Sequence, residues 1–137
     1  MAYVSQEMKA ETAPVIKALL TKYGLKGTLS VRHNSTLVLT ISQGKIDFID
    51  NFNQMIKERD PSGARHINPA RDHIDVNTYW YHEHFSGLAR EFLDQAVQAL
   101  KGPKFFDHSD IQTDYFHLSH YIDINIGRFN RPYALVK

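Results

Sequence analysis

The spacing of hydrophobic residues marks a helix at the start of the chain. Between Ser5 and Tyr23 apolar residues recur three and four positions apart, which predicts an amphipathic helix that ends at Gly24. Pro14 lies inside this stretch, and proline costs about 3 kcal/mol in a helix interior. We therefore expect the helix either to kink at Pro14 or to begin near Thr12, which can cap it.

The next segments predict a β-hairpin and a short helix. Residues 27–45 alternate between apolar and polar on both sides of His33-Asn34-Ser35, as two antiparallel strands joined by a tight turn do. Residues 47–58 return to helical spacing, which predicts a helix of two or three turns.

The second half of the chain predicts a long loop, a helix and a strand. Residues 59–78 contain two prolines, a glycine, three arginines and two histidines with little periodicity, although 73–76 can add a brief strand. Such long loops are often functional. Residues 88–100 have the clearest helical pattern, closed by Gly102-Pro103, and residues 114–127 alternate again as a final strand.

These elements together predict one α+β domain spanning residues 1–137. We expect a small antiparallel β-sheet, made of the hairpin and the C-terminal strand, with the helices packed on one face, because each element has a single apolar side to bury. The other sheet face would be polar and available to a partner. It would carry Ser30, Arg32, Thr36, Thr40, Tyr121, Asp123 and Asn125.

Composition narrows the classes of function. With 137 residues, 42% hydrophobic and 23% charged, the chain can fold as one domain, and its net charge of +1 gives no general attraction to nucleic acid or anionic membrane. The absence of cysteine excludes disulfides, thiolate catalysis and zinc–thiolate sites. With no signal-like N-terminus and no apolar run of about 18 residues, we expect a cytoplasmic protein that does not engage membranes.

His82-Glu83-His84 raises the question of a metal site. In a strand the two histidines would share a face and could chelate an ion, but in a helix they lie about 200° apart. The flanking pattern favours the entrance of a helix. The metal alternative would need His73, Asp75, His117 or His120 as further ligands.

Catalytic motifs give little support to an enzyme. His108 with Asp107 and Asp110 is a candidate dyad, against the simpler reading of a solvated turn. P-loop, G-x-G-x-x-G and nucleophile-elbow motifs are absent. We therefore predict no catalytic residues, no metal ligands and no cofactor.

Two basic segments are candidates for binding. The loop carries Arg59, Arg65, His66, Arg71 and His73, although nearby aspartates dilute its positive field. The C-terminal segment interleaves arginine with aromatic residues, a combination that dominates protein–protein hot spots and also stacks on unpaired bases. The alternative for this segment is a strap that packs back onto the core.

Three stretches of the chain carry a resemblance. "KYGLKGTLSVRHNSTLVLTISQGKIDFI" (22–49), "YHEHF" (81–85) and "SDIQTDYFHLSHYIDINIGRFNRPY" (109–133) resemble the large polyvalent protein-associated domains of bacteriophages and other mobile elements. Residues 27–58 are also similar to the core of a type II-A anti-CRISPR inhibitor of Cas9. This resemblance implies a phage or plasmid protein that acts against a defence system in the bacterial host cytoplasm.

The leading hypothesis is a non-catalytic, anti-CRISPR-like inhibitor that binds a host defence protein or ribonucleoprotein complex. The first alternative is a nucleic-acid-binding accessory domain, and the second is a metal-dependent hydrolase built on His82 and His84. The predicted partner-binding residues are Arg32, His33, Arg59, Arg65, His66, Arg71, Tyr121, Arg128, Phe129, Arg131 and Tyr133.

Overall fold

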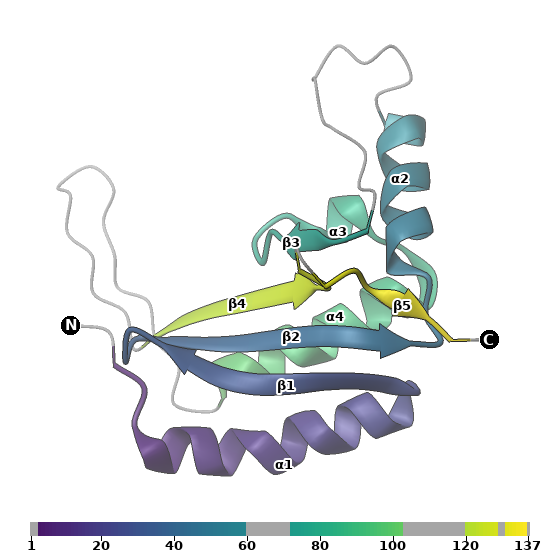
Figure 1. Ribbon diagram of the computed structural model, residues 1–137. Coiled ribbons are helices and arrows are strands. Elements are labelled where there is room, and N and C mark those ends of the chain that lie inside the picture. Colours follow the sequence, from purple (N-terminus) through teal and green to yellow (C-terminus); the bar gives the residue numbers. More distant parts are fainter. Residues whose placement is uncertain (1–2, 60–71, 103–119, 129–130, 137) are drawn as a thin grey trace, which may run out of the picture.

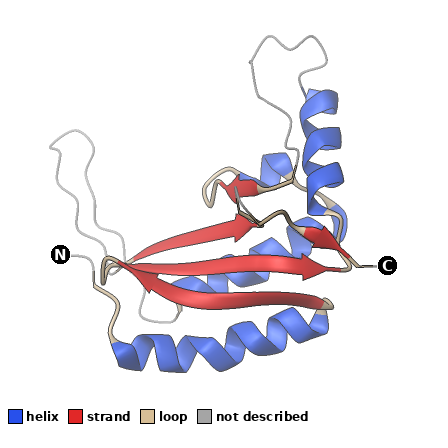
Figure 2. Cartoon of the chain, viewed as in Figure 1, coloured by secondary structure: helices blue, strands red, loops and turns tan. Residues whose placement is uncertain are grey.

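A computed structural model describes residues 3–59, 72–102, 120–128 and 131–136. Four helices and five strands are defined within these ranges (Figures 1 and 2). In chain order they are α1 (Gln6–Lys22), β1 (Leu25–Arg32), β2 (Thr36–Gly44), α2 (Phe48–Arg59), β3 (Ile74–Val76), α3 (Tyr81–His84), α4 (Gly87–Lys101), β4 (Tyr121–Ile126) and β5 (Ala134–Leu135).

The strands form one mixed sheet in the order β1-β2-β4-β3, which confirms the predicted α+β class. β1 pairs with β2 and β3 pairs with β4 in antiparallel fashion, whereas β2 and β4 are parallel. β5 pairs in parallel with the end of β2. The sheet is therefore not antiparallel throughout, because the connection through α2, β3, α3 and α4 is long enough to return the chain in the direction of β2.

Helix α1 runs without interruption through Pro14. It begins after Ser5, whose side chain accepts a hydrogen bond from the backbone N–H of Met8 at 3.0 Å, as an N-cap does. The expected start near Thr12 is wrong, because Thr12 lies inside the helix and is buried on the same side as Ile16. Burial of this face offsets the hydrogen bond that Pro14 cannot make.

The turn between β1 and β2 has a left-handed backbone at two positions. His33 and Asn34 have φ angles of 54° and 58°, and the N–H of Ser35 bonds to the carbonyl of Arg32 at 3.2 Å. The register pairs Arg32 with Thr36, so three residues form the loop, and two of them have the left-handed backbone that asparagine adopts more readily than most residues. The predicted hairpin is therefore confirmed.

The remaining predicted elements are found where the structure describes them. α2, the brief strand β3 and α4 match the expected helix at 47–58, strand at 73–76 and helix at 88–100. The final strand is observed over Tyr121–Ile126, and the part predicted at 114–119 lies outside the described residues.

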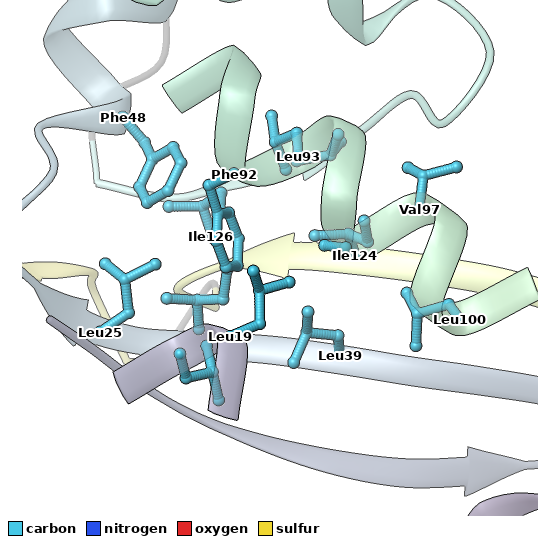
Figure 3. Close-up of a cluster of buried hydrophobic side chains, with 14 of the residues drawn as sticks. Leu19, Leu25, Leu39, Phe48, Phe92, Leu93, Val97, Leu100, Ile124 and Ile126 are labelled. Atoms are coloured by element: carbon cyan, nitrogen blue, oxygen red, sulfur yellow. The ribbon is translucent and has the colours of Figure 1, made fainter. Parts of the chain in front are cut away.

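The core lies between one face of the sheet and helices α1 and α4 (Figure 3). Leu39 from β2, Phe92 and Leu93 from α4, and Ile124 and Ile126 from β4 are all fully buried there. In Figure 1 helix α4 lies behind the sheet, so the view is onto the face that α4 does not cover. Within residues 3–59, 72–102, 120–128 and 131–136, no helix has the length and apolar character needed to cross a bilayer.

Candidate partner-binding site on the open sheet face

The sheet face turned away from α4 is polar along all four main strands. Core residues alternate with polar ones in β1, β3 and β4, and in β2 the core residues Leu37, Leu39 and Ile41 alternate with Thr36, Val38 and Thr40. We call this side the open face. Its members are Ser30, Arg32, Thr36, Val38, Thr40, Asp75, Tyr121, Asp123 and Asn125.

A depression of about 450 Å³ crosses the open face. Ser30 and Arg32 of β1 line one side, Thr40 lies on β2, and Asp75 and Asn125 come from β3 and β4. His73, Gly127 and Arg128 complete its far end. The depression therefore places hydroxyl, guanidinium, carboxylate and amide groups of all four strands around one shallow volume.

Two carboxylates and the guanidinium of Arg32 are the charged groups of the sheet face itself, and Arg128 adds a second guanidinium at the end of the depression. Nη1 of Arg32 lies 3.0 Å from Oδ2 of Asp123, whose side chain is 19% exposed. Partial burial raises the pKa of Asp75, and the charge of Asp123 and a hydrogen bond with it raise that pKa further, against the opposing charge of Arg32. Asp75 and Asp123 therefore share a local negative field that one arginine offsets.

Thr40 contributes a buried hydroxyl with no hydrogen bond. The residue is 7% exposed, and among the described side chains its Oγ1 is the buried polar atom that lacks a partner. Leaving a hydroxyl buried without a hydrogen bond costs about 1–3 kcal/mol in mutational data. The strand therefore carries an unsatisfied hydroxyl beneath the depression.

His73 lies beside the depression in a hydrogen bond with the preceding residue. Its Nδ1 is 2.6 Å from Oδ1 of Asp72, and both side chains are partly exposed. The backbone carbonyl of Asp72 also accepts the N–H of Tyr133 at 2.8 Å, which ties the start of β3 to the C-terminal segment.

Some of the predicted partner-binding residues lie on or beside the open face. Arg32 and Tyr121 belong to it, and Tyr121 is 46% exposed. Arg128 lies at the rim of the depression and forms a backbone bridge with Arg131, which is also exposed. His33 is exposed in the hairpin turn next to Arg32.

The other predicted binding residues do not join this site. Arg59 lies at the end of α2, where its guanidinium is 3.9 Å from Glu83. Tyr133 is buried, with its hydroxyl donating to the carbonyl of Ile46 at 2.6 Å and its ring against Phe48, so it acts as a core residue and not as a surface contact. Arg65, His66, Arg71 and Phe129 lie outside the described residues.

His82-Glu83-His84 forms the one-turn helix α3, in line with the predicted helix entrance. The ring of His84 packs edge-on against Phe52 at 5.5 Å, and partial burial lowers the pKa of His84. No group of three or more potential metal ligands occurs among the described side chains. The candidate dyad at His108 lies outside them.

The sequence predicted Asp123 as a residue of the polar sheet face but did not predict Asp75 there. Asp75 was considered only as a possible metal ligand and as a charge in the loop. The available signal was the Ile74-Asp75-Val76 triplet, in which a carboxylate between two apolar β-branched residues indicates a strand with its polar side outward. Its neighbours across the sheet depend on pairing with β4, which no local pattern specifies.

Comparisons of this chain with protein-family models, curated proteins and solved structures gave no significant match.

Proposed function

We propose that this chain is a non-catalytic binding protein of a phage or other mobile element, and that it blocks a host defence complex by seating its open face on a partner protein. The observation that carries the proposal is the depression, in which polar groups of four strands surround the unpaired hydroxyl of Thr40. A sheet holds such groups in fixed positions, which lowers the entropy lost on binding.

The resemblance to an anti-CRISPR inhibitor supports the open face as the surface that binds the partner. It covers residues 27–58, which include most of the β1–β2 hairpin. That hairpin supplies Ser30, Arg32 and Thr40 to the depression. The anti-defence part of the proposal rests on this resemblance, whereas the binding part rests on the geometry of the face.

The charges favour a protein partner over nucleic acid. Arg32, the arginine of the open face, is engaged by Asp123 at 3.0 Å, so it is not free to pair with a phosphate. Asp75 adds a second carboxylate that would repel a phosphate at short range. Arg128 at the rim adds one further arginine to the lining, whereas a nucleic-acid-binding domain would present a run of unpaired cations along its groove.

The carboxylate pair is better suited to recognition than to acid–base catalysis. Catalytic carboxylate pairs work where water is excluded and a substrate is enclosed. Here Asp75 is exposed and the depression is broad and shallow. Water therefore reaches the pair in the free protein.

The proposal is tested by affinity capture with a matched pair of variants. The bait carries a non-histidine tag and is incubated with nuclease-treated bacterial lysate containing several CRISPR and restriction systems. Ser30→Arg adds a bulky cation at the side of the depression, and Gln98→Arg makes the same charge change on the exposed side of α4.

We expect the wild type and Gln98→Arg to retain one defence effector in near-stoichiometric amount, identified by mass spectrometry, and Ser30→Arg to lose it. If both variants retain the same effector equally, the open face is not the binding surface. Nucleic acid recovered without nuclease, with no protein recovered after it, would favour the accessory-domain alternative, and its affinity would fall steeply with salt.

A further inference from the structure

Two arginines lie opposite each other in the segment that follows β4. The N–H of Arg128 bonds to the carbonyl of Arg131 at 2.8 Å, and the N–H of Arg131 bonds back to the carbonyl of Arg128 at 3.1 Å, so the two residues form an antiparallel bridge. Residues directly opposite in such a pair have Cβ atoms about 5 Å apart on the same face. The two arginine side chains therefore leave the backbone on one side, next to each other.

The positive charges of this pair are not offset by a neighbour. Both arginines are exposed, and neither forms an ion pair with another side chain that the structure describes. The nearby arginine of the open face differs, because Arg32 lies 3.0 Å from Asp123. Like charges directly opposite in a β-pair repel each other, so an anion held between Arg128 and Arg131 would stabilise the arrangement.

The backbone that carries the pair is held on both sides. Before it, the N–H of Gly127 bonds to the carbonyl of Ile41 at 2.8 Å, and at the φ angle of 70° a Cβ on Gly127 would lie 2.6 Å from the backbone nitrogen of Tyr133. After it, Tyr133 donates its N–H to the carbonyl of Asp72 at 2.8 Å and its hydroxyl to the carbonyl of Ile46 at 2.6 Å. A fixed backbone reduces the entropy that is lost when the side chains above it bind a ligand.

We propose that Arg128 and Arg131 form a clamp that binds the carboxylates of an acidic segment of the partner protein. The planar N–H donors of a guanidinium match the two oxygens of a carboxylate, so two neighbouring guanidiniums can hold one carboxylate between them or one each. Arg128 also lines the end of the depression, so the clamp is continuous with the open face. The inference rests on the proposed function, because it names the chemistry by which that face recognises its partner.

The surrounding groups favour an acidic protein segment over nucleic acid. Asp75 lines the same depression as Arg128, and its carboxylate repels a phosphate at short range. A nucleic-acid strand carries a phosphate on every nucleotide, so a strand held by the clamp would bring further phosphates toward Asp75 if it followed the depression. A protein segment can instead place one or two carboxylates at the clamp and neutral groups over Ser30 and Asn125.

The direct test titrates the ¹⁵N-labelled protein at low, constant ionic strength and follows its backbone amides by NMR. The probes are acetylated triglutamate amide, the corresponding triglutamine amide and an oligothymidylate of the same charge as the triglutamate. We expect saturable shifts centred on Arg128 and Arg131 with the triglutamate, none with the triglutamine and clearly weaker binding of the oligothymidylate. Equal or tighter binding of the oligothymidylate, or no saturable shifts at these two residues, would overturn the inference.

Three variants check the assignment. Arg128→Gln and Arg131→Gln each remove one guanidinium, and we expect each to weaken triglutamate binding about fivefold, as for the loss of one exposed ion pair. Arg90→Gln makes the same change at an exposed position of α4 and should bind as the wild type does. Unchanged affinity in both clamp variants, with amide spectra that show them folded, would place the binding elsewhere and refute the clamp.

Affinity capture with the double variant Arg128→Gln/Arg131→Gln separates this inference from the proposed function. If the wild type retains a defence effector and the double variant retains it equally, the clamp is refuted while the binding function stands. If the triglutamate binds at the two arginines but no effector is retained by the wild type, the recognition chemistry stands and the proposed anti-defence function fails.

Discussion

Replacing Thr40 with valine should stabilise the free protein. The two side chains have nearly the same shape, so the substitution exchanges the Oγ1 hydroxyl for a methyl group at a position that is 7% exposed. Because Oγ1 has no hydrogen bond, its removal relieves part of a desolvation cost of about 1–3 kcal/mol. Valine is also well suited to a central strand.

The expected gain is about 1 kcal/mol in the free energy of unfolding, or a rise in Tm of roughly 3–5 °C for a chain of this size. Urea denaturation measures it as an increase in midpoint at unchanged slope. Thr36→Val is the matched control, because Thr36 lies on the same strand and face and is also 7% exposed, but its hydroxyl contacts that of Ser35 at 3.5 Å.

We expect Thr36→Val to give no comparable gain. A Thr40→Val protein that unfolds at the same or lower urea concentration than the wild type would show that Oγ1 is satisfied in solution.

Three further predictions concern charge, core and turn. The pKa of Asp75 lies above its ordinary value of 3.8, so the native state holds the proton of this carboxyl more tightly than the unfolded state does. The free energy of unfolding should therefore fall as pH rises from 3.8 through the raised pKa. Urea titrations at several pH values should show that Asp75→Asn removes this fall and is stabilised most, relative to the wild type, near neutral pH. Tyr133→Phe removes the buried 2.6 Å bond to the Ile46 carbonyl and should lower stability by about 1–3 kcal/mol in the same assay, and an unchanged midpoint would contradict that bond. Replacing His33-Asn34 with Asn-Gly suits the positive φ angles of 54° and 58° and should raise Tm by calorimetry, whereas a lower Tm would argue against the left-handed backbone at these two positions.

Local patterns were sufficient to predict most elements of the fold. Alternation on both sides of His33-Asn34 specified the hairpin, and helical spacing specified α2 and α4. The sequence left open whether α1 kinks at Pro14 or begins near Thr12, because the cost of Pro14 is a local quantity, whereas the burial of Thr12 and Ile16 that offsets it depends on packing against the rest of the domain.

The pairing of strands could not be predicted in the same way. The parallel pairing of β2 with β4 joins Leu39 to Ile124, which lie far apart in the sequence. The same pairing, with β3 beside β4, brings Asp75 next to Asn125 and near Asp123. The alternation of apolar and polar residues therefore identified candidate residues of the open face. Which of them lie together depends on the register between strands, and the hydrophobic pattern specifies only the face on which a residue lies.

The two features that define the site both raise the free energy of the unbound protein. The Thr40 hydroxyl is buried without a hydrogen bond, and partial burial together with the neighbouring Asp123 disfavours the ionised form of the Asp75 carboxyl. A cation brought by a partner would relieve the second of these, because it would offset the charges of the two carboxylates. Cation binding favours ionised Asp75, so affinity should weaken as pH is lowered through its raised pKa, with uptake of a proton by the free protein. A partner that bound through the open face without this pH dependence would be making its contact elsewhere than at Asp75.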